Sequence, residues 1–178
     1  MNGTMRRWTG LIGLSVMLAG CQTLQDWMPG QGGGEASQPP RSASVKRQVA
    51  FPAATYAKLD KRGTATVKGR LSYTTPQGRT VYGADETVSI APATTYSAEA
   101  ADVALSGRRI EPADPRAREY THYAKTDSRG YFIAHGIPSG VFYVAGSVLL
   151  AEGQTRSPVI IKQVELRAGQ TRTIDLSR

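Results

Sequence analysis

From Gly63 onward the chain consists of short runs rich in alternating apolar and polar residues. In the first run, one face carries Ala65, Val67, Gly69, Leu71 and Tyr73. A period of two predicts a half-buried antiparallel strand. Further strands are predicted at 79–82, 86–91, 120–126, 131–134, 141–150, 159–166 and 171–176. About seven to eight short strands, separated by turn residues, predict an all-β fold, namely an antiparallel β-sandwich.

One or two short helices are expected beside these strands. The segment Ser97–Leu105 is rich in alanine, and its first residue is a serine that can cap the helix N-terminus. A second helix is expected over Pro52–Leu59, starting at the proline and packing its apolar side on the sandwich. The charged segment 107–118 contains two prolines and is expected to be a loop.

The N-terminus has the pattern of a bacterial export signal. Arg6 and Arg7 precede a mostly apolar run that ends at Gly20. The run is shorter than the roughly 20 apolar residues that a membrane-spanning helix needs. The sequence Leu18-Ala19-Gly20-Cys21 resembles the lipobox of bacterial lipoproteins, in which the cysteine receives a diacylglycerol and its amine an acyl chain such as palmitate. The resemblance implies a signal peptide at 1–20 and lipid attachment at Cys21, the only cysteine.

The residue after Cys21 predicts the membrane in which the protein is anchored. Gln22 stands where an aspartate resembles an inner-membrane retention signal in enteric-type sorting. We therefore expect anchoring in the outer membrane, with the folded domain in the periplasm. No large apolar residue occurs between Pro29 and Ser44, which is typical of a flexible linker. The lipidated N-terminus and linker are thus expected over 21–50, and the folded domain over 51–178.

Two stretches resemble the signature of carboxypeptidase regulatory-like domains, which are transthyretin-like sandwiches with an Ig-like Greek-key arrangement. They are Thr126-Asp127-Ser128-Arg129-Gly130-Tyr131-Phe132 and Gly136-Ile137-Pro138-Ser139-Gly140-Val141-Phe142-Tyr143-Val144. An aspartate can accept backbone N–H groups in such a turn, and the glycine after it can adopt a positive φ. Structural roles are therefore expected for Asp127, Gly130, Phe132, Pro138 and Gly140. A fold signature of this kind says little about function.

Two hairpins are expected in the second half of the chain. One joins the last two predicted strands around Gly169. The other surrounds residues 127–130, and its register decides where the two histidines lie. With a four-residue loop, His122 faces His135 and the two form a metal pair.

A three-residue loop with a bulge at Gly130 gives the second register. His122 and His135 then fall on opposite faces of the sheet. The core face carries Ala124, Phe132 and Ala134. We favour this register because the glycine fits the bulge, and because two histidines without a third ligand make a poor zinc site. No catalytic residue, metal site or cofactor is expected.

Two enzyme classes have related sandwiches. Intradiol dioxygenases bind iron through two tyrosines and a His-x-His pair, but this chain has no His-x-His and no histidine after His135. Hydroxyisourate hydrolases end in Tyr-Arg-Gly-Ser, whereas this sequence ends in Asp175-Leu176-Ser177-Arg178. A dioxygenase-like enzyme remains the alternative hypothesis, and a regulatory subunit of an envelope peptidase is the third.

The net charge of +8 is spread along the chain. A nucleic-acid site needs clustered cations with exposed aromatic residues between them, so no nucleic-acid partner is expected. The sequence therefore predicts a membrane-anchored, non-enzymatic accessory, scaffolding or binding module, with a protein or a glycan of the cell envelope as its partner.

Overall fold

The computed structural model describes residues 44–150 and 155–178. The signal peptide predicted at 1–20, the lipid site Cys21 and the linker as far as residue 43 lie outside the described residues. Near the start of the described residues, Val45 pairs with Ile110 in an isolated bridge. The described fold therefore includes part of the segment assigned to the linker.

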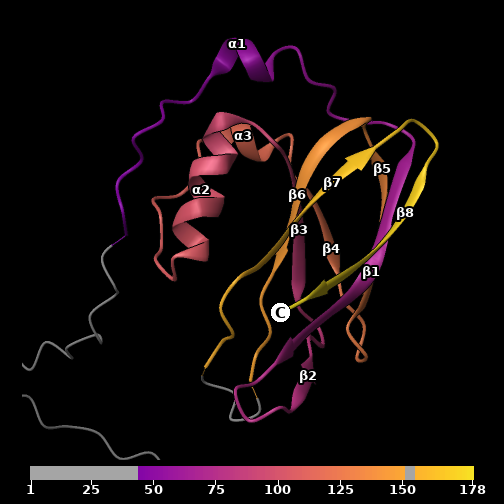
Figure 1. Cartoon of the computed structure of the whole chain (residues 1–178). Helices are drawn as coiled ribbons and strands as arrows, with labels where there is room; N and C mark the ends of the chain where they lie inside the picture. Colours follow the sequence, from indigo (N-terminus) through magenta and orange to yellow (C-terminus); the bar gives the residue numbers. More distant parts are fainter. Residues whose placement is uncertain (1–43, 151–154) are drawn as a thin grey trace, which may run out of the picture. The chain divides into compact units, whose positions relative to one another are not determined.

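The strands form two sheets that face each other (Figure 1). The first sheet contains β1 (Ala65–Thr74), β2 (Thr80–Tyr82), β5 (Tyr131–Ile137) and β8 (Thr171–Ser177). The second sheet has the order β4 (His122–Lys125), β3 (Thr87–Pro92), β6 (Gly140–Gly146), β7 (Ile160–Leu166). The predicted all-β sandwich is confirmed.

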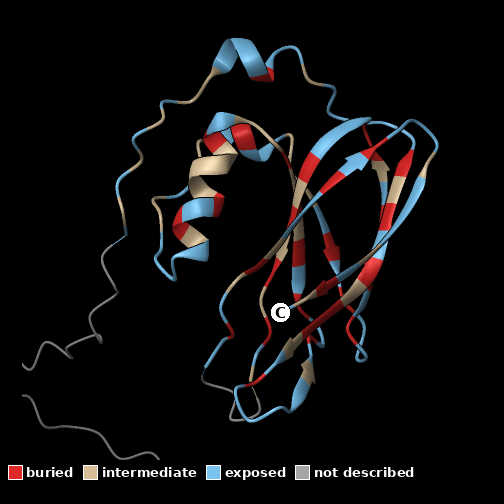
Figure 2. Ribbon diagram, in the orientation of Figure 1, coloured by how far each residue is buried: buried red, intermediate tan, exposed pale blue. Residues whose placement is uncertain are grey.

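The core lies between the two sheets, because each strand turns one set of alternate residues inward (Figure 2). In β1 the predicted alternation holds from Ala65 to Leu71: Ala65, Val67, Gly69 and Leu71 are buried, and Thr66, Lys68 and Arg70 are not. It ends there, because Ser72 is buried and Tyr73 is half-buried. Opposite them, the second sheet contributes Val88, Ile90, Phe142, Val144, Val164 and Leu166. Burial of this apolar surface is the main stabilising contribution to the sandwich.

The predicted hairpin around Gly169 is wrong. β7 pairs with β6, and β8 crosses to the first sheet, where it runs parallel to β1 from Thr66↔Thr171 to Ser72↔Ser177. Gly169 in this turn has a positive φ of 72°, but the turn connects the two sheets. Both strands still bury an apolar face, since Leu166 and Leu176 enter the same core from opposite sheets.

The predicted hairpin around residues 127–130 is also wrong as a strand pair. β4 pairs with β3 in the second sheet, and β5 pairs with β1 in the first, so neither proposed register exists. The residues of β5 that point into the core and those that point to solvent are nevertheless the ones that the bulged register predicted. Phe132 and Ala134 are buried, and His135 is exposed.

Among the described residues, three short helices accompany the sheets: α1 (Ala53–Tyr56), α2 (Thr95–Leu105) and α3 (Pro115–Arg118). α2 is capped by Thr94 and not by Ser97. The Thr94 side chain accepts from the Ser97 N–H at 3.2 Å, and the Ser97 hydroxyl accepts from the Thr94 N–H at 2.9 Å. Because this reciprocal pair satisfies two N–H groups, the helix starts before the predicted residue.

The other helices also differ from their predictions. α3 lies in the segment expected to be a loop, since Asp114 caps it and Pro115 takes its first turn. α1 is shorter than predicted, and Pro52 is its N-cap. Its Tyr56 packs with α2 and α3, not in the core of the sandwich, in a cluster formed by Tyr56, Tyr96, Ala117, Val49, Phe51, Leu59, Ala113 and Tyr120.

Candidate functional site

The first sheet has an outer face that no described helix covers, whereas α2 and α3 lie beside the second sheet (Figure 1). Since alternate residues point to opposite sides of a strand, the residues next to the core residues project from this face. They form an open groove of about 960 Å³. It is lined by Lys68, Gly69, Arg70, Lys125, Thr126, Asp127, Tyr131, Phe132, Ile133, Thr173, Ile174 and Asp175.

Two large apolar side chains of β5 stand exposed in this groove. Tyr131 is 47% exposed and Ile133 is 52% exposed. Between them in the sequence, Phe132 is buried in the core. The same short strand therefore holds the sandwich together on one side and presents an apolar surface to solvent on the other.

Arg70 lies between two exposed tyrosines from neighbouring strands. Its guanidinium carbon is 3.5 Å from the ring centre of Tyr82 on β2 and 4.7 Å from that of Tyr131 on β5. The Arg70 Nε also donates a 2.9 Å hydrogen bond to the carbonyl oxygen of Arg129. A guanidinium held over aromatic rings keeps its charge and its planar edge of donors.

Two of the turn residues predicted as structural, Asp127 and Gly130, lie at the end of β5 that borders this groove. Asp127 Oδ1 accepts from the backbone N–H groups of Arg129 at 2.8 Å and Tyr131 at 2.9 Å. These bonds, that from Tyr131 above all, hold the pKa of Asp127 below its usual value. Gly130 has a φ of +83°, and an added Cβ would come 2.7 Å from the Leu71 carbonyl oxygen. The turn thus fixes the start of β5, where Tyr131 begins the exposed face.

The other two predicted turn residues lie at the far end of β5. Pro138 is buried, and its backbone approaches Gly63 so closely that a Cβ there would meet Pro138 Cα. Gly140 has a φ of +141° and opens β6. Both residues thus belong to the passage from the first sheet to the second, away from the groove.

The two histidines come from different sheets, yet both line one open pocket of about 370 Å³. His135 Nδ1 is 3.1 Å from the Thr66 hydroxyl oxygen. His122 Nε2 is buried without a hydrogen-bond partner, and burial lowers the pKa of His122. Within residues 44–150 and 155–178, no group of three or more His, Cys, Asp or Glu side chains is arranged to hold a metal ion.

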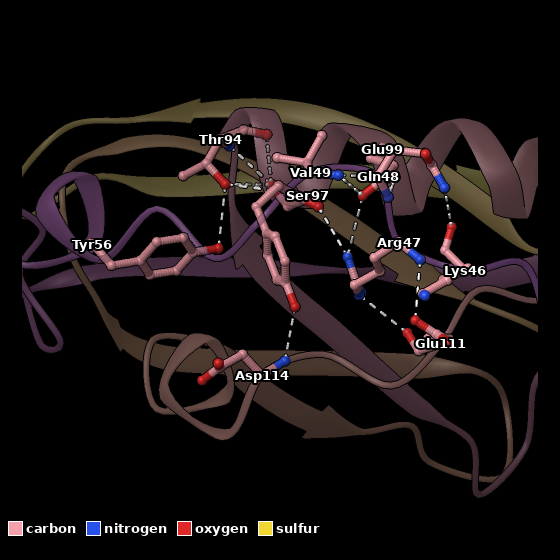
Figure 3. Close-up of polar contacts among 11 residues, drawn as sticks. Lys46, Arg47, Gln48, Val49, Tyr56, Thr94, Ser97, Glu99, Glu111 and Asp114 are labelled. Carbon is pink, nitrogen blue, oxygen red and sulfur yellow. Dashed lines mark hydrogen bonds and ion pairs between the residues drawn. The ribbon is translucent and has the colours of Figure 1, made fainter.

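A second polar cluster fastens the segment before α1, which we call the N-terminal strap (residues 45–51), to α2 (Figure 3). The Arg47 guanidinium lies 4.2 Å from the Tyr96 ring centre and 3.8 Å from Glu99 Oε2. Glu99 also accepts the Gln48 N–H at 2.6 Å. On the other side, Glu111 Oε2 accepts the Arg47 N–H at 3.1 Å.

This cluster is largely shielded from water, since the Arg47 and Glu99 side chains are only 12% and 14% exposed. Hydrogen bonds to charged groups in such surroundings are stronger than neutral ones. The strap is therefore held by directed polar bonds as well as by the aromatic cluster around Tyr56. In the sequence, the strap lies between the predicted lipid site at Cys21 and the first helix of the folded domain.

Sequence reasoning did not select Arg70, Tyr82, Tyr131 and Ile133 as a site. Part of the signal was present, because an inward Phe132 requires that its two neighbours point outward. The approach of Arg70 to Tyr82 depends on the pairing of β1 with β2, in which Ser72 lies opposite Tyr82. The strand pattern alone does not give that register.

The sandwich and its exposed face are consistent with a binding module. No family model matches the sequence, and no curated protein matches it. Among solved structures, the chain is similar to a protein from Pseudomonas aeruginosa described as a "putative carbohydrate binding protein". The TM-score is 0.62 at 26% sequence identity, over 72% of this chain and 97% of that one. In the described part of the chain, no helix is both long and apolar enough to span a membrane.

Proposed function

We propose that this protein is a lipid-anchored binding module of the bacterial cell envelope, and that it binds a glycan on the outer face of the first sheet. The observation that carries the proposal is the exposed arrangement of Tyr82, Arg70 and Tyr131. The description of the similar Pseudomonas aeruginosa protein supports a glycan as the partner.

The chemistry of the groove suits a sugar chain. Sugar rings offer apolar C–H faces and polar hydroxyl edges, and an open groove with both kinds of group meets both needs. Ile133 and the free parts of the Tyr131 ring supply apolar contact. Lys68, Thr173 and Asp175 supply donors and acceptors along the same groove. The protein acts by holding its partner, without catalysing a reaction.

Binding is tested with the full-length protein, purified in detergent, by co-sedimentation with insoluble polysaccharides and peptidoglycan sacculi. Tyr131→Ala is expected to weaken binding about tenfold, because stacking and apolar contact are lost. The matched control is Tyr123→Ala, which removes a tyrosine of 57% exposure from β4 in the other sheet. Equal binding by both variants, or no binding of any glycan by the wild type, contradicts the proposal. Capture of an envelope protein alone favours a protein partner.

The lipid anchor is tested separately. Cys21 follows Leu-Ala-Gly after an apolar run, so Cys21→Ala is expected to abolish incorporation of labelled fatty acid and to leave the precursor unprocessed. Cys21→Ser is a second variant with nearly the same volume and no thiol. If either variant is still acylated and recovered in the membrane fraction, the lipoprotein assignment is wrong. The glycan-binding proposal does not depend on this result.

A further inference from the structure

We infer that the outer-face groove selects acidic glycans, and that the guanidinium of Arg70 holds a carboxylate of the ligand. This inference rests on the proposed glycan binding and specifies its ligand class. Three features of the groove support it: the free N–H donors of Arg70, the charged residues of the lining, and the exposed apolar side chains beside them.

The arginine keeps free donors on a fixed plane. Of its three nitrogens, Nε is occupied by the Arg129 carbonyl oxygen at 2.9 Å. Within the described residues, neither terminal nitrogen of Arg70 has a hydrogen-bond partner, and Arg70 forms no ion pair. Tyr82 and Tyr131 lie close to the guanidinium and limit its motion. A planar, immobilised pair of N–H donors matches the two oxygens of a carboxylate.

Two acids lie near Arg70, since Asp175 is its partner in the β1–β8 pairing and Asp127 lines the same groove, but within the described residues neither forms an ion pair with it. The groove lining contains three cations, Lys68, Arg70 and Lys125, and two acids, Asp127 and Asp175. The Asp127 carboxylate is already bound by backbone N–H groups, which satisfy part of its accepting capacity. Asp175 accepts from the Ser177 hydroxyl at 2.9 Å. The charge balance therefore favours an anionic ligand over a cationic one.

The apolar groups fix where the rest of the ligand lies. The guanidinium covers part of the two tyrosine rings, so neither ring is a fully open platform for a neutral sugar. Ile133 is 52% exposed, belongs to β5 like Tyr131 and points to the same side. A sugar ring whose carboxylate meets Arg70 can rest against Tyr131 and Ile133, while Lys68 on β1 reaches its hydroxyl groups or a second carboxylate.

The test compares two ligands that have the same sugar backbone and differ in whether their carboxyl groups are charged. Oligogalacturonate and its fully methyl-esterified form have the same sugar rings, and only the first has carboxylates. Isothermal titration calorimetry with the full-length protein is expected to give at least about tenfold tighter binding of the acid. Arg70→Gln is expected to remove this preference. Arg70→Lys keeps the charge but not the planar pair of donors, and it is expected to recover only part of it.

The matched control is Arg172→Gln, which removes an exposed arginine from β8 outside the groove lining. It is expected to keep the full preference for the acid. Equal affinity of the wild type for acid and ester overturns the inference and leaves glycan binding intact. Failure of every glycan to bind refutes the proposed function itself. Equally tight binding of dextran sulfate or of phosphatidylglycerol vesicles shows unselective attraction of anions and also overturns the inference.

Because the comparison of acid with ester uses the wild type, it decides the question even if a variant folds poorly. The melting temperature of each variant is measured beside its affinity. If Arg70→Gln loses the preference for the acid over the ester, the result supports the inference only when its melting temperature matches that of Arg172→Gln. If Arg70→Gln keeps the preference at an unchanged melting temperature, Arg70 is not the residue that holds the carboxylate.

Discussion

Thr126 and Glu86 are joined by three hydrogen bonds where the chain leaves the second sheet, and in the longest of them Thr126 Oγ1 donates to the Glu86 carbonyl oxygen at 3.3 Å. The Glu86 N–H donates to Thr126 Oγ1 at 2.7 Å, and the Thr126 N–H donates to the Glu86 carbonyl oxygen at 2.9 Å. Both residues are buried. The Glu86 carboxylate in turn accepts the Leu149 N–H and pairs with Arg156 at 2.8 Å. This joint directs the following turn toward the first sheet and the exposed face of β5.

Removal of the threonine hydroxyl tests the joint. Thr126→Val keeps the size of the side chain but leaves the buried Glu86 N–H without its acceptor. We expect the free energy of unfolding to fall by about 1–3 kcal/mol, measured by urea denaturation. The control is Thr173→Val on the exposed side of β8, with an expected change within about ±0.5 kcal/mol. A silent Thr126→Val would show that the joint does not stabilise the fold.

Phe132 and His135 test the two sides of β5. Phe132 is 4% exposed in the core, so Phe132→Ala is expected to cost about 3–5 kcal/mol of unfolding free energy. His135 is exposed, and His135→Ala is expected to stay within about ±0.5 kcal/mol. Thermal and urea denaturation of both variants give the comparison. The opposite order of effects would mean that β5 presents its other face to the core.

Gly130 and Gly78 separate backbone strain from close contact. Both have a positive φ, of +83° and +79°, but only at Gly130 would a Cβ meet other atoms, the nearest being the Leu71 carbonyl oxygen at 2.7 Å. Gly78→Ala is expected to cost about 1 kcal/mol through its φ alone. Gly130→Ala is expected to cost more than about 2 kcal/mol, because the contact adds to the strain. If urea denaturation gives the same loss of unfolding free energy for both variants, the contact with the Leu71 carbonyl oxygen does not add to the cost at Gly130.

His122 is expected to make stability depend on pH. Burial lowers its pKa in the folded state, so the folded protein binds this proton less readily than the unfolded chain. The contribution is fully present above the unfolded pKa of about 6.5, and it is lost as the pH falls through the folded pKa. His122→Gln is expected to reduce the fall in unfolding free energy measured between about pH 7 and pH 5. An unchanged pH profile would contradict this assignment.

The strand pattern predicted the faces of the strands better than their partners. In β1 and β5 the alternation identified Leu71 and Phe132 as core residues, because burial depends only on which side a residue takes. Pairing depends on which strand edges meet. The segments around Gly130 and Gly169 contain good turn residues, yet each connects two sheets, since a tight turn can end a strand without pairing it to the next.

The candidate site was predictable only in part for the same reason. The outward position of Tyr131 and Ile133 follows from the inward position of Phe132. The contact of Arg70 with Tyr82 requires the register of β1 with β2, and the strap cluster requires Arg47 to reach Glu99 across 52 positions of sequence, a pairing that no local pattern encodes.

The parallel pairing of β8 with β1 has a consequence for the order in which the molecule folds. Residues 66–72 of β1 pair with residues 171–177 of β8. The first sheet therefore contains a pairing between the first and the last of the described strands. Pairings between segments so distant in the sequence form slowly, because a long loop must close first. During synthesis, β1 has one edge without a partner until β8 has emerged, and an unpaired edge invites pairing with another chain. Protection of that edge before the last strand arrives is therefore a requirement for producing this protein in a monomeric, folded form.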